Sequence, residues 1–257
     1  MPARRSSVAR TTRRSRHRSL LGMASMLPVA VSLIPSGAPP RTKGQISGAI
    51  RATCGIACGK ERWAVKTMSD PAASDVTLEP VPTTVAALVA TPAPDTAAED
   101  IRLNQIEKQT FSVHAKLVGF KQELQGSEGD HDFHVVLQDL NSSDTMIVEI
   151  PSPACQGVCN SLVLDRIQEA RNDFAAAFPK DPPSSDFALV DGTPTVEVTG
   201  IGMFDYFHGQ TGVAKNCIEL HPVLGIKFPP PGTFEAHHDP PQNPKPGPKS
   251  DYHCIPK

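Results

Sequence analysis

The chain has 257 residues, of which 39% are hydrophobic, 20% are charged and 26 are proline. This composition excludes collagen, because glycine has no three-residue period, and a membrane protein with many spans, because only one apolar run is long enough to suggest a membrane. The 25 basic and 27 acidic side chains nearly balance, giving a net charge of −2.

Residues 1–38 have the pattern of a secretory signal peptide. Seven arginines and no acid in the first 18 residues precede an apolar run over 20–34 and the small residues 36–38. An uncleaved anchor is the alternative, although the run is shorter than the about 20 residues that a span needs. Arg13 and Arg14 leave a twin-arginine route open beside the general one. We therefore expect an exported protein, periplasmic or extracellular.

Export also changes the charge argument. Without the seven arginines, 18 basic residues face 27 acidic ones, a net charge of −9. A chain this acidic lacks the broad basic surface of non-specific nucleic-acid binders, so any contact with nucleic acid would be local.

The segments on either side of the expected domain are rich in proline. Residues 39–105 are mostly Pro, Ala, Thr and Ser and predict a linker, with a short docking patch around Trp63 and Val65. Residues 229–257 predict a proline-rich, extended tail. We expect both ends to be disordered.

Residues 106–228 carry the signals of regular structure. Apolar residues alternate in the three stretches 111–121, 133–138 and 145–150, which predicts three strands. A helix is expected over 161–178, where apolar residues recur at spacings of three and four, and prolines follow. Two more strands are expected over 195–207 and 217–228.

Three strands, one helix and two strands are the order of a five-stranded OB-like barrel, with the helix between strands three and four. The predicted fold class is therefore mainly β with one helix. An open mixed α+β sheet covered by the same helix is the alternative.

Six cysteines in an exported chain predict disulfides. The spacing in CQGVC suggests a local bridge between Cys155 and Cys159. A four-cysteine zinc site is the alternative, but its usual spacing is CxxC.

Strand parity selects the first candidate site. If Phe133, Val135 and Leu137 face the core, the polar residues that alternate with apolar ones on three strands face outward. These outward residues are Asp132, His134, Glu149, Glu219 and His221. They suit acid–base chemistry or a divalent cation, and an ordinary solvated sheet face is the alternative.

The connection FDYFHGQTGVAKN between the last two strands is the second candidate. Tyr206, His208 and Gln210 combine an aromatic ring with polar groups, as OB domains do when they bind bases or sugars. The alternative is that the aromatic rings complete the core.

Four blocks of the sequence, ERWAVKTMSDP, PVPTTVAAL, TMIVEIPSPAC and FDYFHGQTGVAKNCIELHPVL, resemble a family of uncharacterised exported bacterial proteins. The resemblance covers most of the chain from Cys58 to Phe228 and implies export and the domain boundaries. The family has no assigned activity, so the resemblance implies no mechanism.

Together these features predict an exported, non-enzymatic binding module for a polar ligand, an oligosaccharide or short oligonucleotide. No GxSxG, HExxH, P-loop or GxGxxG motif occurs. No cofactor is expected, with a divalent cation as the alternative that the acids and imidazoles leave open. A metal-dependent phosphodiesterase or nuclease on the same barrel is the alternative function, and a structural envelope-associated protein is a further one.

Overall fold

The computed structural model describes residues 54–123, 129–238 and 246–257, and all structural statements below concern these residues. The expected signal peptide lies outside them. In this part of the chain, no helix is both long enough and apolar enough to cross a bilayer.

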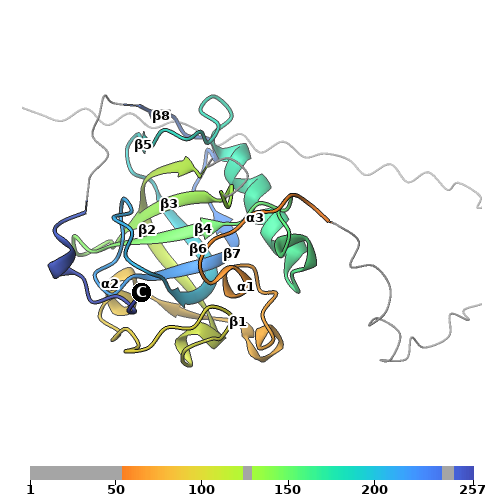
Figure 1. Ribbon diagram of the computed structural model, residues 1–257. Helices are drawn as coiled ribbons and strands as arrows, with labels where there is room; N and C mark the ends of the chain where they lie inside the picture. Colours follow the sequence, from red (N-terminus) through yellow and green to blue (C-terminus); the bar gives the residue numbers. More distant parts are fainter. Residues whose placement is uncertain (1–53, 124–128, 239–245) are drawn as a thin grey trace, which may run out of the picture. The chain divides into compact units, whose positions relative to one another are not determined.

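Five strands form a closed barrel (Figure 1). They are β2 (Gln109–Gln122), β3 (Phe133–Gln138), β4 (Thr145–Ile150), β6 (Thr195–Phe204) and β7 (Ile218–Lys227). The order around the barrel is β2-β3-β4-β7-β6 and back to β2, with only β4 and β7 parallel among these pairs. The mainly β barrel predicted from the sequence is confirmed. The open sheet is wrong, because β2 is long enough to pair with β6 through its first half and with β3 through its second.

Alternation along the strands fills the barrel. Along each strand, alternate side chains are mostly apolar and point into one shared core, which removes these groups from water. Buried members of this core include Val113, Leu117, Phe133, Val135, Leu137, Met146, Val148, Ile150, Val198, Ile218 and Leu220. The predicted inward set on β3 is therefore confirmed.

The helix α3 (Leu164–Ala177) lies between the barrel strands β4 and β6 in chain order, as predicted. Its buried residues Ile167, Ala170, Phe174 and Ala177 recur at spacings of three and four, which places them on one face. The Phe174 ring lies 5.1 Å from the ring of Phe120 in β2, measured between centroids. This face thus joins the barrel core.

Residues 54–107, called here the N-terminal layer, are folded rather than a linker. They contain α1 (Trp63–Lys66), β1 (Thr77–Thr83) and α2 (Val85–Val89), and β1 pairs with β2 in parallel. The buried Arg62 donates to both carboxylate oxygens of Glu107 (2.6 and 2.9 Å) and to the carbonyl of Phe204 in β6 (2.5 Å). The linker prediction is wrong for this segment because charge pairs and cross-links, rather than apolar mass alone, attach it to the barrel.

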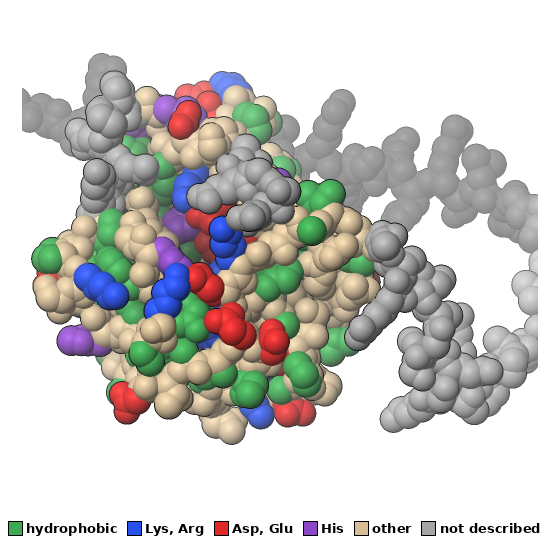
Figure 2. Space-filling model, in the orientation of Figure 1, with side chains coloured by type: hydrophobic (Ala, Val, Ile, Leu, Met, Phe, Trp, Pro, Cys, Tyr) green, Lys and Arg blue, Asp and Glu red, His purple; other side chains and the backbone are tan. Residues whose placement is uncertain are grey.

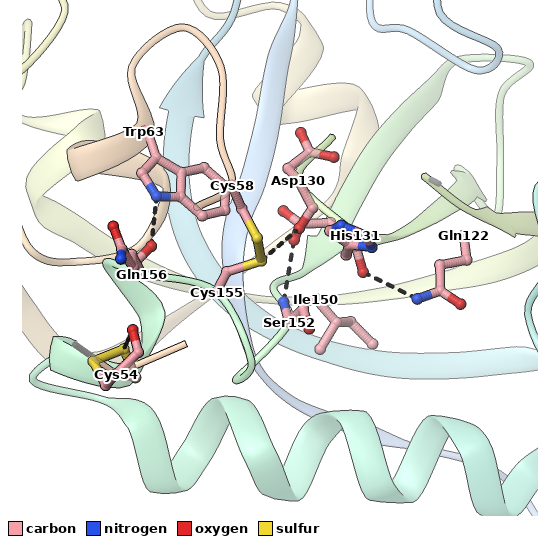
Figure 3. The surroundings of a disulfide bond; sticks show 12 residues. Cys54, Cys58, Trp63, Gln122, Asp130, His131, Ile150, Ser152, Cys155 and Gln156 are labelled. Atoms are coloured by element: carbon pink, nitrogen blue, oxygen red, sulfur yellow. Dashed lines mark hydrogen bonds between the residues drawn. A yellow bond between two sulfur atoms is a disulfide. The ribbon is translucent and has the colours of Figure 1, made fainter. Parts of the chain in front are cut away.

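Two disulfides fix the start of this layer. They join Cys54 to Cys159 and Cys58 to Cys155, so the predicted bridge between Cys155 and Cys159 is wrong. Ile56 exchanges backbone hydrogen bonds with Ala154 and Gln156 (2.8 and 2.9 Å), which brings the two CxxxC motifs side by side. Figure 3 shows the Cys58–Cys155 bond between Trp63 and Asp130.

The described part of the C-terminal tail is also attached. The short strand β8 (Ala236–His237) pairs with β5 (Ala188–Val190), which in turn pairs with β2. A third disulfide joins Cys217 to Cys254. The tail over 246–257 is therefore held against the barrel and is not a free extension.

Candidate functional site

The polar residues on the outer face of β3, β4 and β7 are buried. Parity places them opposite the barrel core, as expected, but they do not reach solvent as an ordinary outer face would. The exposed fractions are 0% for Asp132, His134 and His221, 5% for Glu149 and 2% for Glu219. The expectation of an exposed surface is wrong because the side chain of Lys66 and the connection between β6 and β7 lie against this face.

That connection approaches β3 very closely. A Cβ atom added at Gly212, whose φ is +80°, would lie 2.4 Å from a methyl carbon of Val136. A side chain at this position would therefore lift the connection off the sheet, and glycine also tolerates the left-handed backbone.

His221 lies among three carboxylates. Its Nε2 atom is 3.2 Å from Asp132 Oδ2, and its Nδ1 atom is 3.1 Å from Glu149 Oε2 and 3.9 Å from Glu219 Oε2. No directed hydrogen bond forms at either ring nitrogen, at Asp132 Oδ2 or at Glu219 Oε2. These contacts are close and electrostatic, but they leave the hydrogen-bonding capacity of the buried atoms unused.

His134 is held in a different way. Its Nδ1 atom lies 3.0 Å from Glu149 Oε1, across the β3–β4 pair, and its Nε2 atom lies 2.9 Å from the carbonyl oxygen of Thr211. Both ring nitrogens therefore have partners. His134 ties the covering connection to the sheet and orients Glu149.

One buried lysine faces this cluster from the N-terminal layer. Lys66 of α1 pairs with Asp205 at 3.1 Å. Burial acts to lower the pKa of Lys66, but the charge of Asp205, followed by those of Glu149 and Glu219, raises it well above the ordinary value. Lys66 is therefore a cation among acids.

Burial and crowding shift the pKa values of the acids apart. Burial, with the charges of Asp132 and Glu149, raises the pKa of Asp130 to about 8. Burial also raises the pKa of Glu219 to about 7, helped by the charges of Glu149 and Asp205. Burial acts to raise the pKa of Glu149 too, but its contacts with the two imidazoles lower it well below the ordinary value. Two acids of the cluster thus change charge near neutral pH.

The two imidazoles are shifted in one direction. Burial acts to lower the pKa of His134, but the hydrogen bond and charge of Glu149 outweigh burial and raise it. Burial also acts to lower the pKa of His221, but its close contacts with Asp132, Glu149 and Glu219 outweigh burial. They raise this pKa well above its ordinary value.

A pocket of about 510 Å³ opens above this cluster. Its walls come from the N-terminal layer, the end of β2 with the start of the β3 segment, and the β6–β7 connection. The lining residues are Lys60, Glu61, Lys66, Lys121, Glu123, Gly129, Asp130, Glu149, Asp205, His208, Gly209, Gln210, Thr211, Glu219 and Lys257. Figure 2 shows acidic, basic and histidine side chains gathered around a hollow near the middle of this face.

Among the described residues, two groups have the spacing of metal ligands. One atom each from Asp132, Glu149 and His221 lie within 4.8 Å of one another, and the same holds for Glu123, His134 and Glu149. Carboxylate oxygens and imidazole nitrogens are ligands that Zn²⁺ and Mn²⁺ accept. The site therefore combines acid–base groups with a ligand set for a cation.

Of the predicted residues in the β6–β7 connection, two line the pocket and one does not. His208 lies 3.1 Å from Glu61, and the Gln210 side chain accepts the His208 N–H (2.7 Å). Tyr206 is buried instead, and its hydroxyl donates to Glu99 (3.1 Å). Its prediction as a contact for ligand is wrong because the ring and hydroxyl pack against the N-terminal layer.

Sequence reasoning missed several residues of the site, among them Lys66, Asp130 and Asp205. Asp130 could have been found, because it continues the alternation of Asp132 and His134 two residues upstream. Lys66 could not, since it reaches the site only through the folding of a segment that composition assigns to a linker.

Comparisons with known proteins add no relative. No family model, no curated protein and no solved structure matches this chain.

Proposed function

We propose that the protein is an exported binding module that holds an oligosaccharide in the pocket above β3, β4 and β7. The observation that carries this proposal is the mostly charged and polar lining of a pocket of about 510 Å³, a volume within the usual range of small-molecule sites. Its position also supports the proposal, because OB domains bind ligands over strands two and three between the loops after strands one and four.

The charge of the lining favours a sugar over an oligonucleotide. Six carboxylates and four lysines line the described part of the pocket. Sugar hydroxyls donate to carboxylates and accept from lysines, whereas a phosphate would meet the carboxylates as like charges. Neutral or amino sugars are therefore the preferred class.

Binding can be tested by saturation-transfer NMR and calorimetry with neutral, amino and acidic sugars of one to three units, and with short DNA and RNA. We expect a neutral or amino sugar to bind and Glu123→Gln, in the pocket wall, to weaken it about tenfold or more through loss of a charged hydrogen bond. Glu235→Gln is the control, because Glu235 forms an exposed pair with Lys180. Binding of oligonucleotides but of no sugar would contradict the proposal.

Export is part of the proposal. All six cysteines of the chain are paired in disulfides, and such cross-links persist in oxidising compartments. A fusion of residues 1–38 to a bacterial alkaline phosphatase, active only after export, tests the signal peptide. An inactive fusion would contradict it.

We also propose that the chain is related to the family of exported bacterial proteins that its sequence blocks resemble. Its blocks contain Lys66, Glu149, His208, Glu219 and His221, all of which lie in the pocket or its floor. The blocks on which the resemblance rests therefore coincide with the candidate site.

A second candidate function is metal-dependent hydrolysis of a phosphodiester. The observation that favours it is the close approach of Asp132, Glu149 and His221. Incubation with DNA, RNA and a chromogenic phosphodiester in Mg²⁺, Ca²⁺, Mn²⁺ and Zn²⁺ tests it, and unchanged substrates in all four metals would eliminate it.

A further inference from the structure

We propose that Asp132, Glu149 and His221 bind one divalent cation at the floor of the pocket, with Glu219 beside it. One donor atom from each of the three lies within 4.8 Å of the other two. Donors held about 2.0 to 2.6 Å from one ion lie roughly 3 to 5 Å apart, so these residues can share an ion without a change of backbone. The site is independent of the sugar proposed above, because the cation can bind alone.

The buried atoms of this group have ion-pair contacts with one another but lack the directed hydrogen bonds that such atoms normally form. Asp132 Oδ1 accepts the Ser152 N–H (3.1 Å), but Asp132 Oδ2 accepts no hydrogen bond. Glu219 Oε2 and both ring nitrogens of His221 are likewise without one, and all three side chains are at most 2% exposed. Since buried polar atoms nearly always find partners, this arrangement points to a ligand that supplies them.

His134 does not belong to the ligand set, although parity groups it with the others. Its two nitrogens are engaged by Glu149 Oε1 and by the carbonyl of Thr211. This arrangement fixes Glu149 and leaves Glu149 Oε2 directed toward His221, 3.1 Å away. Outer groups of this kind orient metal ligands in proteins.

The carboxylates at this place outnumber the basic groups among them. In the described part of the chain, five buried carboxylates, those of Asp130, Asp132, Glu149, Asp205 and Glu219, lie around the lysine Lys66 and the imidazoles of His134 and His221. Two carboxylates with one imidazole form a mixed oxygen and nitrogen set, which suits Mn²⁺ and Zn²⁺ better than Ca²⁺. Glu149 and Glu219 also line the pocket, which gives the ion a path of entry.

The other triad of Glu123, His134 and Glu149 is a weaker candidate. Glu123 pairs with Lys121 at 2.6 Å and is more exposed, and the Nδ1 atom of His134 is already hydrogen-bonded to Glu149. The two candidate sites share only Glu149, so separate substitutions distinguish them.

The test is a titration of the chelator-treated, disulfide-bonded protein with Mn²⁺ and with Zn²⁺ by calorimetry, without any sugar. We expect one equivalent to bind, and Asp132→Asn and His221→Gln each to weaken binding about tenfold or more. The matched control is Asp191→Asn, which removes an aspartate that pairs with a histidine on the surface. Near-UV circular dichroism shows whether each variant is folded.

A second measurement does not depend on the variants. Pulsed electron paramagnetic resonance of Mn²⁺ bound to the wild-type protein should show coupling to the nitrogen of one imidazole. The proposal is overturned if the wild type binds no stoichiometric metal, if no nitrogen coupling appears, or if Glu123→Gln abolishes binding while Asp132→Asn does not. Failure to bind sugar would leave these results unchanged, so the two proposals fail separately.

Discussion

The paired disulfides at the start of the N-terminal layer lead to a quantitative prediction about non-additivity. Cys54–Cys159 and Cys58–Cys155 span 105 and 97 residues and close nearly the same loop. Removing one pair by Cys→Ala substitution leaves the other to hold that loop. The free energy of unfolding that is lost when one bridge is removed alone should therefore be smaller than half of the loss when both are removed.

The loop lengths set the magnitude. In the chain-entropy relation, a bridge that closes about 100 residues stabilises the folded state by about 4.7 kcal/mol, and a second one beside it, closing a ring of about ten residues, by about 2.7 kcal/mol. Each single removal should cost about 2.7 kcal/mol and the double removal about 7 kcal/mol, which leaves a coupling of about 2 kcal/mol.

Urea unfolding of the wild type, both single-bridge variants and the double-bridge variant measures this coupling. The control is removal of Cys217–Cys254, which closes a separate loop of 37 residues and should cost about 4 kcal/mol, additively with either single removal. If the double removal costs the sum of the two single removals, or if one single removal costs as much as the double one, the two bridges do not share the closure of one loop.

Three further predictions concern the pocket and its walls. In metal-free protein, the pKa of Asp130 is raised from 3.8 to about 8, so the folded state keeps a proton that the unfolded state loses. The free energy of unfolding should fall as pH rises between these two pKa values. Asp130→Asn should make the urea midpoint depend less on pH between pH 5 and 9, and an equal fall in the variant would count against this. Gly212→Ala should destabilise by about 1–3 kcal/mol more than Gly209→Ala in thermal melts, since both glycines have positive φ but only the first would clash with a neighbour, and equal losses would contradict the clash. Arg62→Met should cost about 3–5 kcal/mol in urea unfolding because it leaves Glu107 buried and unpaired, whereas a loss below about 1 kcal/mol would mean that the pair is solvated.

The barrel could be predicted from the sequence because its signals are local. The alternation in β3 and β4 and the spacing of three and four along α3 are periods of two and 3.6 residues, set by the geometry of strands and helices. The strand bounds of β3 and β4 agree with the prediction at both ends. Closure then follows from the need to pair strand edges.

The N-terminal layer could not be predicted, because its attachments are distant in sequence. Arg62 finds Glu107 45 residues away and the Phe204 carbonyl 142 residues away, and Cys54 finds Cys159 after 105 residues. None of these three contacts leaves a periodic pattern, and the surrounding Pro, Ala and Thr have the composition of a linker. The layer instead depends on a few strong contacts.

Only part of the candidate site could be predicted, because strand parity is a local signal whereas the cover of the site comes from residues distant in sequence. Parity places His134, Glu149, Glu219 and His221 on one face, because the strands that carry them are neighbours. Whether that face meets water or a cover depends on the N-terminal layer, which supplies Lys66. The change from an open polar surface to a buried floor therefore lies outside what alternation alone can show.

An anomalous difference map from crystals grown with Mn²⁺ tests the cation site most directly. We expect a peak at about 2.0–2.6 Å from a carboxylate oxygen of Asp132, one of Glu149 and a ring nitrogen of His221. A well-ordered floor in which the imidazole remains among the carboxylates without such a peak, at a saturating concentration of the metal, would contradict it.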